Sequence, residues 1–348
     1  MPAARHILKR LAPLAALLLI LLGLVTGSAP ERAPPTSGPT DIGLYAYAAA
    51  QAAHPATYYA RTIAEQRREG YELKPFVTVR PPTLSFILAA LGSEGARRAA
   101  VIALALVSLG LWWLHLGQEG VTLVPRALDL TVLATGALPA VAVQAPYMHE
   151  VWAGLLISAA LASRRADAFR LSVALGLAAA LIRELAAPYL VVMLVLALLG
   201  RRPREAGAWA LAIGLFGAAL AFHAHMVDSL IIPSDHYGAG WVKLSGWPFV
   251  LHAAQWNAVL AAGPAWLSAL AVPIALAGAV TWTSPLGRRL AAVLVAYVLA
   301  FAVVGRPENF YWGLLFAPLL PLGFARAFRA LPWAYLKKSS GTRSPIAA

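Results

Sequence analysis

Long apolar runs alternate with short polar segments along most of this chain. Ten runs have the length and spacing expected of α-helices that cross a bilayer, although several are shorter than the ideal of about 20 residues. They lie at residues 11–27, 99–116, 128–144, 151–163, 169–182, 186–200, 206–224, 265–284, 289–304 and 311–328. The pattern predicts an all-α polytopic membrane protein with about ten transmembrane helices, which places both termini on one side.

Composition supports this interpretation. Hydrophobic residues make up 60% of the chain and charged residues 12%, whereas a soluble domain carries about 25% charged residues. Ten spans leave no room in 348 residues for a separate soluble domain, so residues 1–348 are predicted to form one membrane domain. The first run is longer than the roughly 7–15 apolar residues of a secretory signal, which favours an uncleaved first span.

The charges predict the orientation, because Lys and Arg accumulate in cytoplasmic loops. With the N-terminus inside, the cytoplasmic segments hold 17 cations and four acids, and the outer segments hold 11 of each. The whole net charge of +13 then lies on the cytoplasmic side. Both termini are therefore predicted to be cytoplasmic, and no nucleic-acid partner is needed to explain the basic composition.

Candidate chemistry concentrates on the predicted outer side. Eleven of the fifteen carboxylates lie there, which exceeds what membrane embedding alone requires. The chain contains no cysteine, so disulfides, thiolate metal sites and cysteine nucleophiles are excluded.

The first outer loop, residues 28–98, is the longest segment between spans. After a Pro-rich linker it shows a helical pattern from Ile42 to about Glu69, with a kink expected at Pro55. Tyrosines recur on its apolar face, as in amphipathic helices that lie at the membrane interface.

Two further apolar segments are too short to cross a bilayer as helices. They are Leu84 to Leu91 in the first outer loop and Phe249 to Leu260 in the fourth, which covers about residues 225–263. Both are predicted to be interfacial or re-entrant helices. They either frame a cavity for a lipid-linked substrate or serve only as packing elements.

The order of these features resembles the polytopic lipid-linked-sugar glycosyltransferases of the GT-C type, including the bacterial dolichyl-phosphate-mannose-mannosyltransferase-like group. The chain departs from the fuller pattern by lacking a soluble C-terminal domain and a paired-acid Asp-x-Asp or Glu-x-Asp signature, which leaves metal dependence open. The matching segments are Pro39-Thr40-Asp41 with Tyr45 and Tyr47, Arg80-Pro81-Pro82-Thr83-Leu84, Gly92 to Arg98, and Arg306 to Tyr311.

This resemblance implies an inverting enzyme that transfers a hexosyl or pentosyl sugar from a polyprenyl-phosphate donor. The acceptor would be a glycan, lipid or protein of the cell envelope, and the active face would be the periplasmic face of a bacterial inner membrane. Such a transfer needs a base that takes the proton of the acceptor hydroxyl. The resemblance assigns that role to Asp41, although Thr40 or Asp41 would also cap the helix that follows.

The same transfer needs cationic groups that hold the phosphate as it leaves. Binding of the substrate or its phosphate is assigned to Arg306, Arg80 and Lys74, with His149, Glu150 and Tyr59 as further candidates. The alternative for Arg306 is an arginine that reaches the headgroups, and the alternative for His149-Glu150 is a solvated helix start. Arg183-Glu184, at the predicted outer end of the fifth span, is interpreted as a local ion pair before Pro188.

No His-Glu-x-x-His motif or comparable metal-binding cluster occurs in the sequence. Glu150, Asp235 and His236 are weak candidate ligands for a divalent cation, Mg or Mn.

Two functions of other classes stay open at this point. A secondary transporter or lipid flippase would show internal repeats and ionisable groups near the bilayer midplane; no repeat is evident, and Asp129 is the one carboxylate placed inside a predicted span. A non-catalytic scaffold for envelope assembly would tolerate replacement of Asp41, Glu150 and Arg306 together.

Overall fold

The computed structural model describes residues 2–27, 41–240 and 242–330, with side chains from residue 11 to 329 within those ranges. This part of the chain is helical, and its β-structure is limited to two isolated bridges, Lys74 with Tyr237 and Val242 with Val304. The Pro-rich linker and Thr40 lie outside the described residues.

Each predicted apolar run overlaps at least one helix. These helices are α1 (Pro2–Thr26), α5 (Glu94–Gln118), α6 (Leu123–Ala137), α7 (His149–Ser163), α8 (Arg170–Ile182), α9 (Ala187–Leu199), α10 (Pro203–Asp228), α13 (Trp266–Thr281), α14 (Pro285–Val303) and α15 (Leu320–Ala330), which follows the 3₁₀ segment η6 (Pro307–Leu315).

Fewer of these helices meet the requirements for crossing a membrane by themselves. Within the described residues, four are long and apolar enough, namely Glu94–Gln118, Leu123–Val141, α10 and α14. A fifth is added if η6 and α15, which meet at a bend of 67°, form one broken span. The helices thus support an integral membrane protein, while the count of ten spans and their orientation stay predictions.

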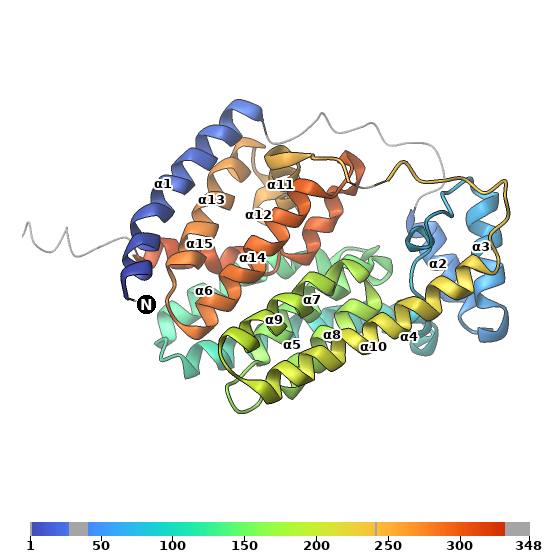
Figure 1. Cartoon of the computed structure of the whole chain (residues 1–348), viewed down its shortest axis with the longest axis horizontal. Helices are drawn as coiled ribbons and strands as arrows, with labels where there is room; N and C mark the ends of the chain where they lie inside the picture. The colour runs from blue at the N-terminus through green and yellow to red at the C-terminus, as the bar shows by residue number, and fades with distance from the viewer. Residues whose placement is uncertain (1, 28–40, 241, 331–348) are drawn as a thin grey trace, which may run out of the picture.

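The helices form one bundle around α7 (Figure 1). Helices α1, α13 and α15 pack together along one side, and α8, α9 and α10 pack together along another. All fifteen residues of α7 are buried, between α5, α8, α14 and η6. A helix that is apolar all round fits this central position.

A layer of short helices gathers at one end of the bundle, beside the C-terminal end of α10 (Figure 1). The pattern predicted from Ile42 to Glu69 is broken rather than kinked: α2 (Asp41–Gln51) ends before Pro55, and a 3₁₀ turn leads into α3 (Tyr58–Arg68). The predicted short helix is α4 (Thr83–Leu91), and Gly92 ends it with a φ of 73°.

The second short segment is also divided. Helix α11 (Gly246–Ala254) and helix α12 (Ala258–Ala262) replace a single run from Phe249 to Leu260. The side chain of Asn257 separates them, because it accepts a bond from the Val259 amide at 3.1 Å and so caps α12.

Glycines allow the backbone of η6 and of the segment leading into α15 to contact the backbones of neighbouring helices directly. A Cβ at Gly154 of α7 would lie 2.1 Å from the Leu314 carbonyl oxygen, and one at Gly136 of α6 would lie 2.3 Å from that of Ala317. A Cβ at Gly313 would meet the Ala253 oxygen at 1.9 Å. Close approach of this kind requires residues without side chains.

We expect Gly154→Ala to lower the free energy of unfolding by about 1–3 kcal/mol, because the added methyl group must displace a backbone carbonyl. Thermal unfolding of the purified protein in detergent measures the change. Gly214→Ala is the matched control, since a Cβ at that helical position of α10 meets no atom within 4 Å. Equal stability of the two variants would contradict this packing.

Candidate functional site

A polar cavity of about 420 Å³ lies under the layer of short helices, where α2, the segment before α4, the turn before α9 and η6 come together. Its size is in the range of small-molecule sites. Its ionisable and hydroxylic lining residues are Asp41, Tyr45, Tyr71, Glu72, Thr78, Arg80, Arg183, Glu184, Arg306, Glu308 and Tyr311.

The floor of the cavity is a buried ion-pair network. Arg183, which is 1% exposed, donates from Nε to Oε1 of Glu150 at 2.5 Å, and Glu150 is 2% exposed. Arg183 also pairs with Glu184, and its guanidinium lies 5.7 Å from the centre of the Trp312 ring. Two carboxylates therefore neutralise this arginine, which a buried charge requires.

Arg80 reaches the cavity from the Arg-Pro-Pro segment and is bonded differently. Its Nε donates to the Tyr45 hydroxyl at 3.0 Å, and its Nη2 donates to the Tyr311 hydroxyl at 3.4 Å. Its closest approach to a carboxylate is 3.9 Å, to Glu184, which already pairs with Arg183. Among the three cavity arginines, Arg80 is thus the one whose hydrogen bonds end on neutral hydroxyls, while Glu184 and Glu150 act on its charge without a hydrogen bond.

The third arginine forms one wall with Glu72. Arg306 donates from both terminal nitrogens to the two Glu72 oxygens, each at 3.1 Å, and its Nε lies 3.2 Å from Glu308. These bonds hold the pKa of the Glu72 carboxyl below its ordinary value. The Ala239 amide also donates to Glu72 at 3.3 Å, which ties the loop after α10 to this wall.

Asp41 stands exposed at the first position of α2, on the rim of the cavity. The hydroxyl of Tyr71 bonds to it, and burial together with the Asp41 charge raises the pKa of Tyr71 to about 12. Asp41 thus combines the helix-start position expected of a cap with access to the cavity.

The structure brings three of the predicted site residues, Asp41, Arg80 and Arg306, to one cavity. Glu150 lies behind its floor, paired with Arg183. His149 is buried beside it and packs edge-on against Tyr45, with ring centres 4.9 Å apart.

Two other predicted residues lie elsewhere. Lys74 donates to the Pro233 carbonyl at 3.3 Å and lies 5.1 Å from the centre of the Tyr237 ring. The Tyr59 hydroxyl bonds to Nδ1 of His223 at 2.9 Å and joins α3 to α10. Neither side chain lines the cavity.

The candidate metal ligands are not gathered. Asp235 accepts two bonds from Arg67, at 2.6 and 2.9 Å, while His236 is exposed and Glu150 is paired with Arg183. Among the described residues, no group of three or more His, Asp or Glu side chains could hold a metal ion. The residues suggested for Mg or Mn therefore do not fit a shared site.

Sequence reasoning missed parts of the site. Glu72 carries no motif and became relevant only through its pairing with Arg306. Arg183 and Glu184 were interpreted as a local ion pair; that pair is present, and both residues also line the cavity. The signal that could have identified them is their charge at the outer end of an apolar run.

The Asp235–Arg67 pair yields a prediction about pH. Arg67 and the Ile232 amide lower the pKa of Asp235 from 3.8 to about 2. A lowered pKa stabilises the folded state fully above 3.8, and this contribution is lost as the pH falls toward 2. We expect amides of the segment 230–240 to exchange about tenfold faster in Asp235→Asn at pH 6, because charged hydrogen bonds are removed.

Hydrogen exchange measured by mass spectrometry tests this expectation, with His236→Ala as the neighbouring control. The difference between Asp235→Asn and the unmodified protein should shrink below pH 3. Identical exchange at pH 6 would show that the pair does not hold this segment.

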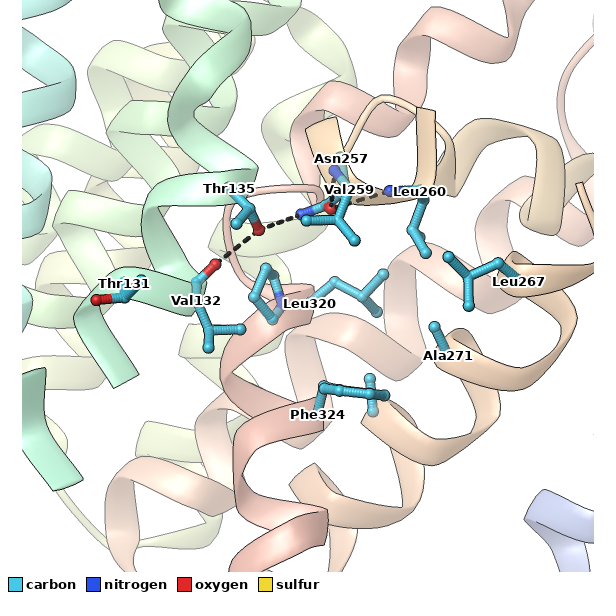
Figure 2. A pocket seen from close by; sticks show the side chains of 12 residues that line it. Thr131, Val132, Thr135, Asn257, Val259, Leu260, Leu267, Ala271, Leu320 and Phe324 are labelled. Atoms are coloured by element: carbon cyan, nitrogen blue, oxygen red, sulfur yellow. Dashed lines mark hydrogen bonds between the residues drawn. The ribbon is translucent and has the colours of Figure 1, made fainter. Parts of the chain in front are cut away.

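A second cavity, of about 220 Å³, is lined mainly by apolar side chains (Figure 2). It lies between α6, α12, α13 and α15, and its lining includes Val132, Leu260, Leu267 and Phe324. The polar Asn257 side chain in its wall donates to the Thr135 hydroxyl at 3.0 Å. This cavity presents no ionisable side chain.

Comparisons with known proteins leave the resemblance without independent support. No protein-family model, no curated protein and no solved structure matches this chain. The polar cavity is therefore the feature of this chain that bears on its function.

Proposed function

We propose that this chain is a membrane glycosyltransferase that transfers a sugar from a polyprenyl-phosphate donor to a cell-envelope acceptor. The observation that supports it most is the juxtaposition in one cavity of an accessible carboxylate, Asp41, and an arginine whose hydrogen bonds end on hydroxyls, Arg80. Transfer from a sugar phosphate needs these two functions, a base and an anion-binding group.

In the proposed reaction, the acceptor oxygen forms a bond to the anomeric carbon while the bond from that carbon to the phosphate oxygen breaks. The hydroxyl proton of the acceptor passes to the Asp41 carboxylate. The departing polyprenyl phosphate gains the electron pair of the broken bond, and Arg80 stabilises its negative charge. Tyr45 and Tyr311 hold the Arg80 guanidinium in place through their hydroxyls.

The proposed setting is a bacterial inner membrane, with ten spans, cytoplasmic termini and the cavity at the outer face. The location of the cavity agrees with that orientation, because it lies at the ends of helices that charge counting assigns to the outside. The apolar chain of the donor could then stay in the bilayer while its phosphate reaches the cavity.

The bonding of Asp129 favours this function over transport. This fully buried carboxylate of α6 pairs with Arg329 at 2.7 Å and with Arg326 at 3.4 Å, both from α15. Two cations on a neighbouring helix make it a structural link between α6 and α15, whereas coupled transport uses ionisable groups that are released during the cycle.

We expect Asp41→Asn to lower transfer at least about a hundredfold, because the amide cannot accept the proton. Purified protein in proteoliposomes is incubated with labelled polyprenyl-phosphate sugars and envelope extract, and label in the product is counted. Asp228→Asn, which removes an exposed carboxylate at the end of α10, is the control and should keep full activity. An active, folded Asp41→Asn enzyme would remove Asp41 from this role, and transport without a sugar donor would contradict the transferase.

Arg80→Lys tests the phosphate-binding group. Lysine keeps the charge but loses the fork that reaches Tyr45 and Tyr311. We expect KM for the donor to rise about tenfold, with a smaller fall in kcat, in the same assay. Arg98→Gln, at an exposed arginine of α5, should leave both constants unchanged. An unaltered KM in Arg80→Lys would place the phosphate elsewhere.

A further inference from the structure

A second charged centre lies at the opposite end of the bundle from the polar cavity. It consists of Arg164 after α7, Arg202 before α10, Arg289 in the second turn of α14, and Glu205 at the start of α10. Helices α7 and α14 run from one centre to the other, and their 15 and 19 residues correspond to lengths of about 22 and 28 Å. We name these four residues the arginine cluster.

Glu205 is the carboxylate that lies near all three arginines of the cluster. Arg164 makes a two-fold bond to Glu205, with Nε to Oε1 at 2.9 Å, and both side chains are 3% exposed. Arg202 approaches the same carboxylate at 3.5 Å. Arg289 is 9% exposed and close enough for its charge to act on Glu205, yet it donates only to the Pro285 carbonyl, at 2.9 Å.

The other carboxylates at this end are occupied or distant from Arg289. Asp129 pairs with Arg326 and Arg329, and Glu119 lies close enough to Arg165 for their charges to interact. Asp167 is exposed in the loop after α7. Among the described residues, the cluster therefore holds two positive charges in excess, one of them on the buried Arg289. An uncompensated buried charge is costly, so an anion from outside the chain is expected here.

The surroundings indicate which anion. Arg202 is partly exposed, and the last residues of α9, Leu198 and Leu199, which precede it by only a few positions, expose large apolar side chains. Cations beside exposed leucines at the ends of apolar helices match a phospholipid, which has an anionic headgroup above hydrocarbon chains. A free phosphate would make no use of the leucines.

We propose that the arginine cluster binds the headgroup phosphate of an anionic phospholipid, such as phosphatidylglycerol or cardiolipin. Arg289 and Arg202 donate to the phosphate, and Glu205 holds Arg164 beside them. Binding would fix the ends of α7, α10 and α14 relative to one another at the predicted cytoplasmic surface. The site is independent of the reaction proposed for the polar cavity.

Purified protein in a neutral detergent tests the site. Phosphatidylglycerol, phosphatidylcholine or inorganic phosphate is titrated in, and the rise in unfolding temperature and the lipids retained in native mass spectrometry are recorded. We expect phosphatidylglycerol to stabilise the protein and Arg289→Gln to weaken its apparent affinity at least about fivefold, since one basic group near a membrane surface contributes on this scale. Arg288→Gln, at the adjacent exposed arginine, should leave the affinity unchanged.

Three results would overturn the proposal: equal stabilisation by phosphatidylcholine, the full effect from inorganic phosphate, or the same loss in Arg288→Gln and Arg289→Gln. If Arg289→Gln does not fold, Arg202→Gln replaces it, because that partly exposed arginine should also lower the affinity for phosphatidylglycerol.

Discussion

The ion pair between Arg183 and Glu150 organises the charges at the end of the bundle that holds the polar cavity. It lies at the start of α7, whose residues are all buried, and its two side chains are 1% and 2% exposed. Glu150 and Glu184 both pair directly with Arg183, whereas the hydrogen bonds of Arg80 end on hydroxyls. The buried pair thus fixes α7 against the turn before α9 and leaves the Arg80 guanidinium without a hydrogen bond to a carboxylate.

The cavity above this pair combines rigid and accessible parts. Arg306 and Glu72 form a two-fold pair that joins η6 to the first outer loop, while Asp41 faces the opening. A fixed floor of paired charges with an accessible carboxylate at the rim suits the proposed reaction, in which a large lipid stays in the membrane and only its reacting end enters. Preorganised charges of this kind need no rearrangement as the leaving group develops its charge.

The helical architecture could be predicted from sequence because it depends on local periodicity and composition. The short helix ended by Gly92 and the division of the first outer loop near Pro55 also follow from local backbone rules. Arg80 and Arg306 were identified through motifs, but their different bonding could not be, since it depends on residues more than a hundred positions away. Lys74 and Tyr59 were also candidates for substrate binding, but tertiary packing turns both toward other partners.

The length of α8 and α9 bears on how the protein sits in its bilayer. Each has 13 residues, or about 20 Å, against a hydrocarbon thickness of about 30 Å. Segments this short are accommodated by local thinning of the bilayer. In a chain that spans the membrane as proposed, the turn between them, which carries Arg183 and Glu184, would lie at the bottom of a dimple in the outer leaflet. Lipid phosphates would then descend to the level of the cavity, and no part of the protein would need to lift the donor out of the membrane.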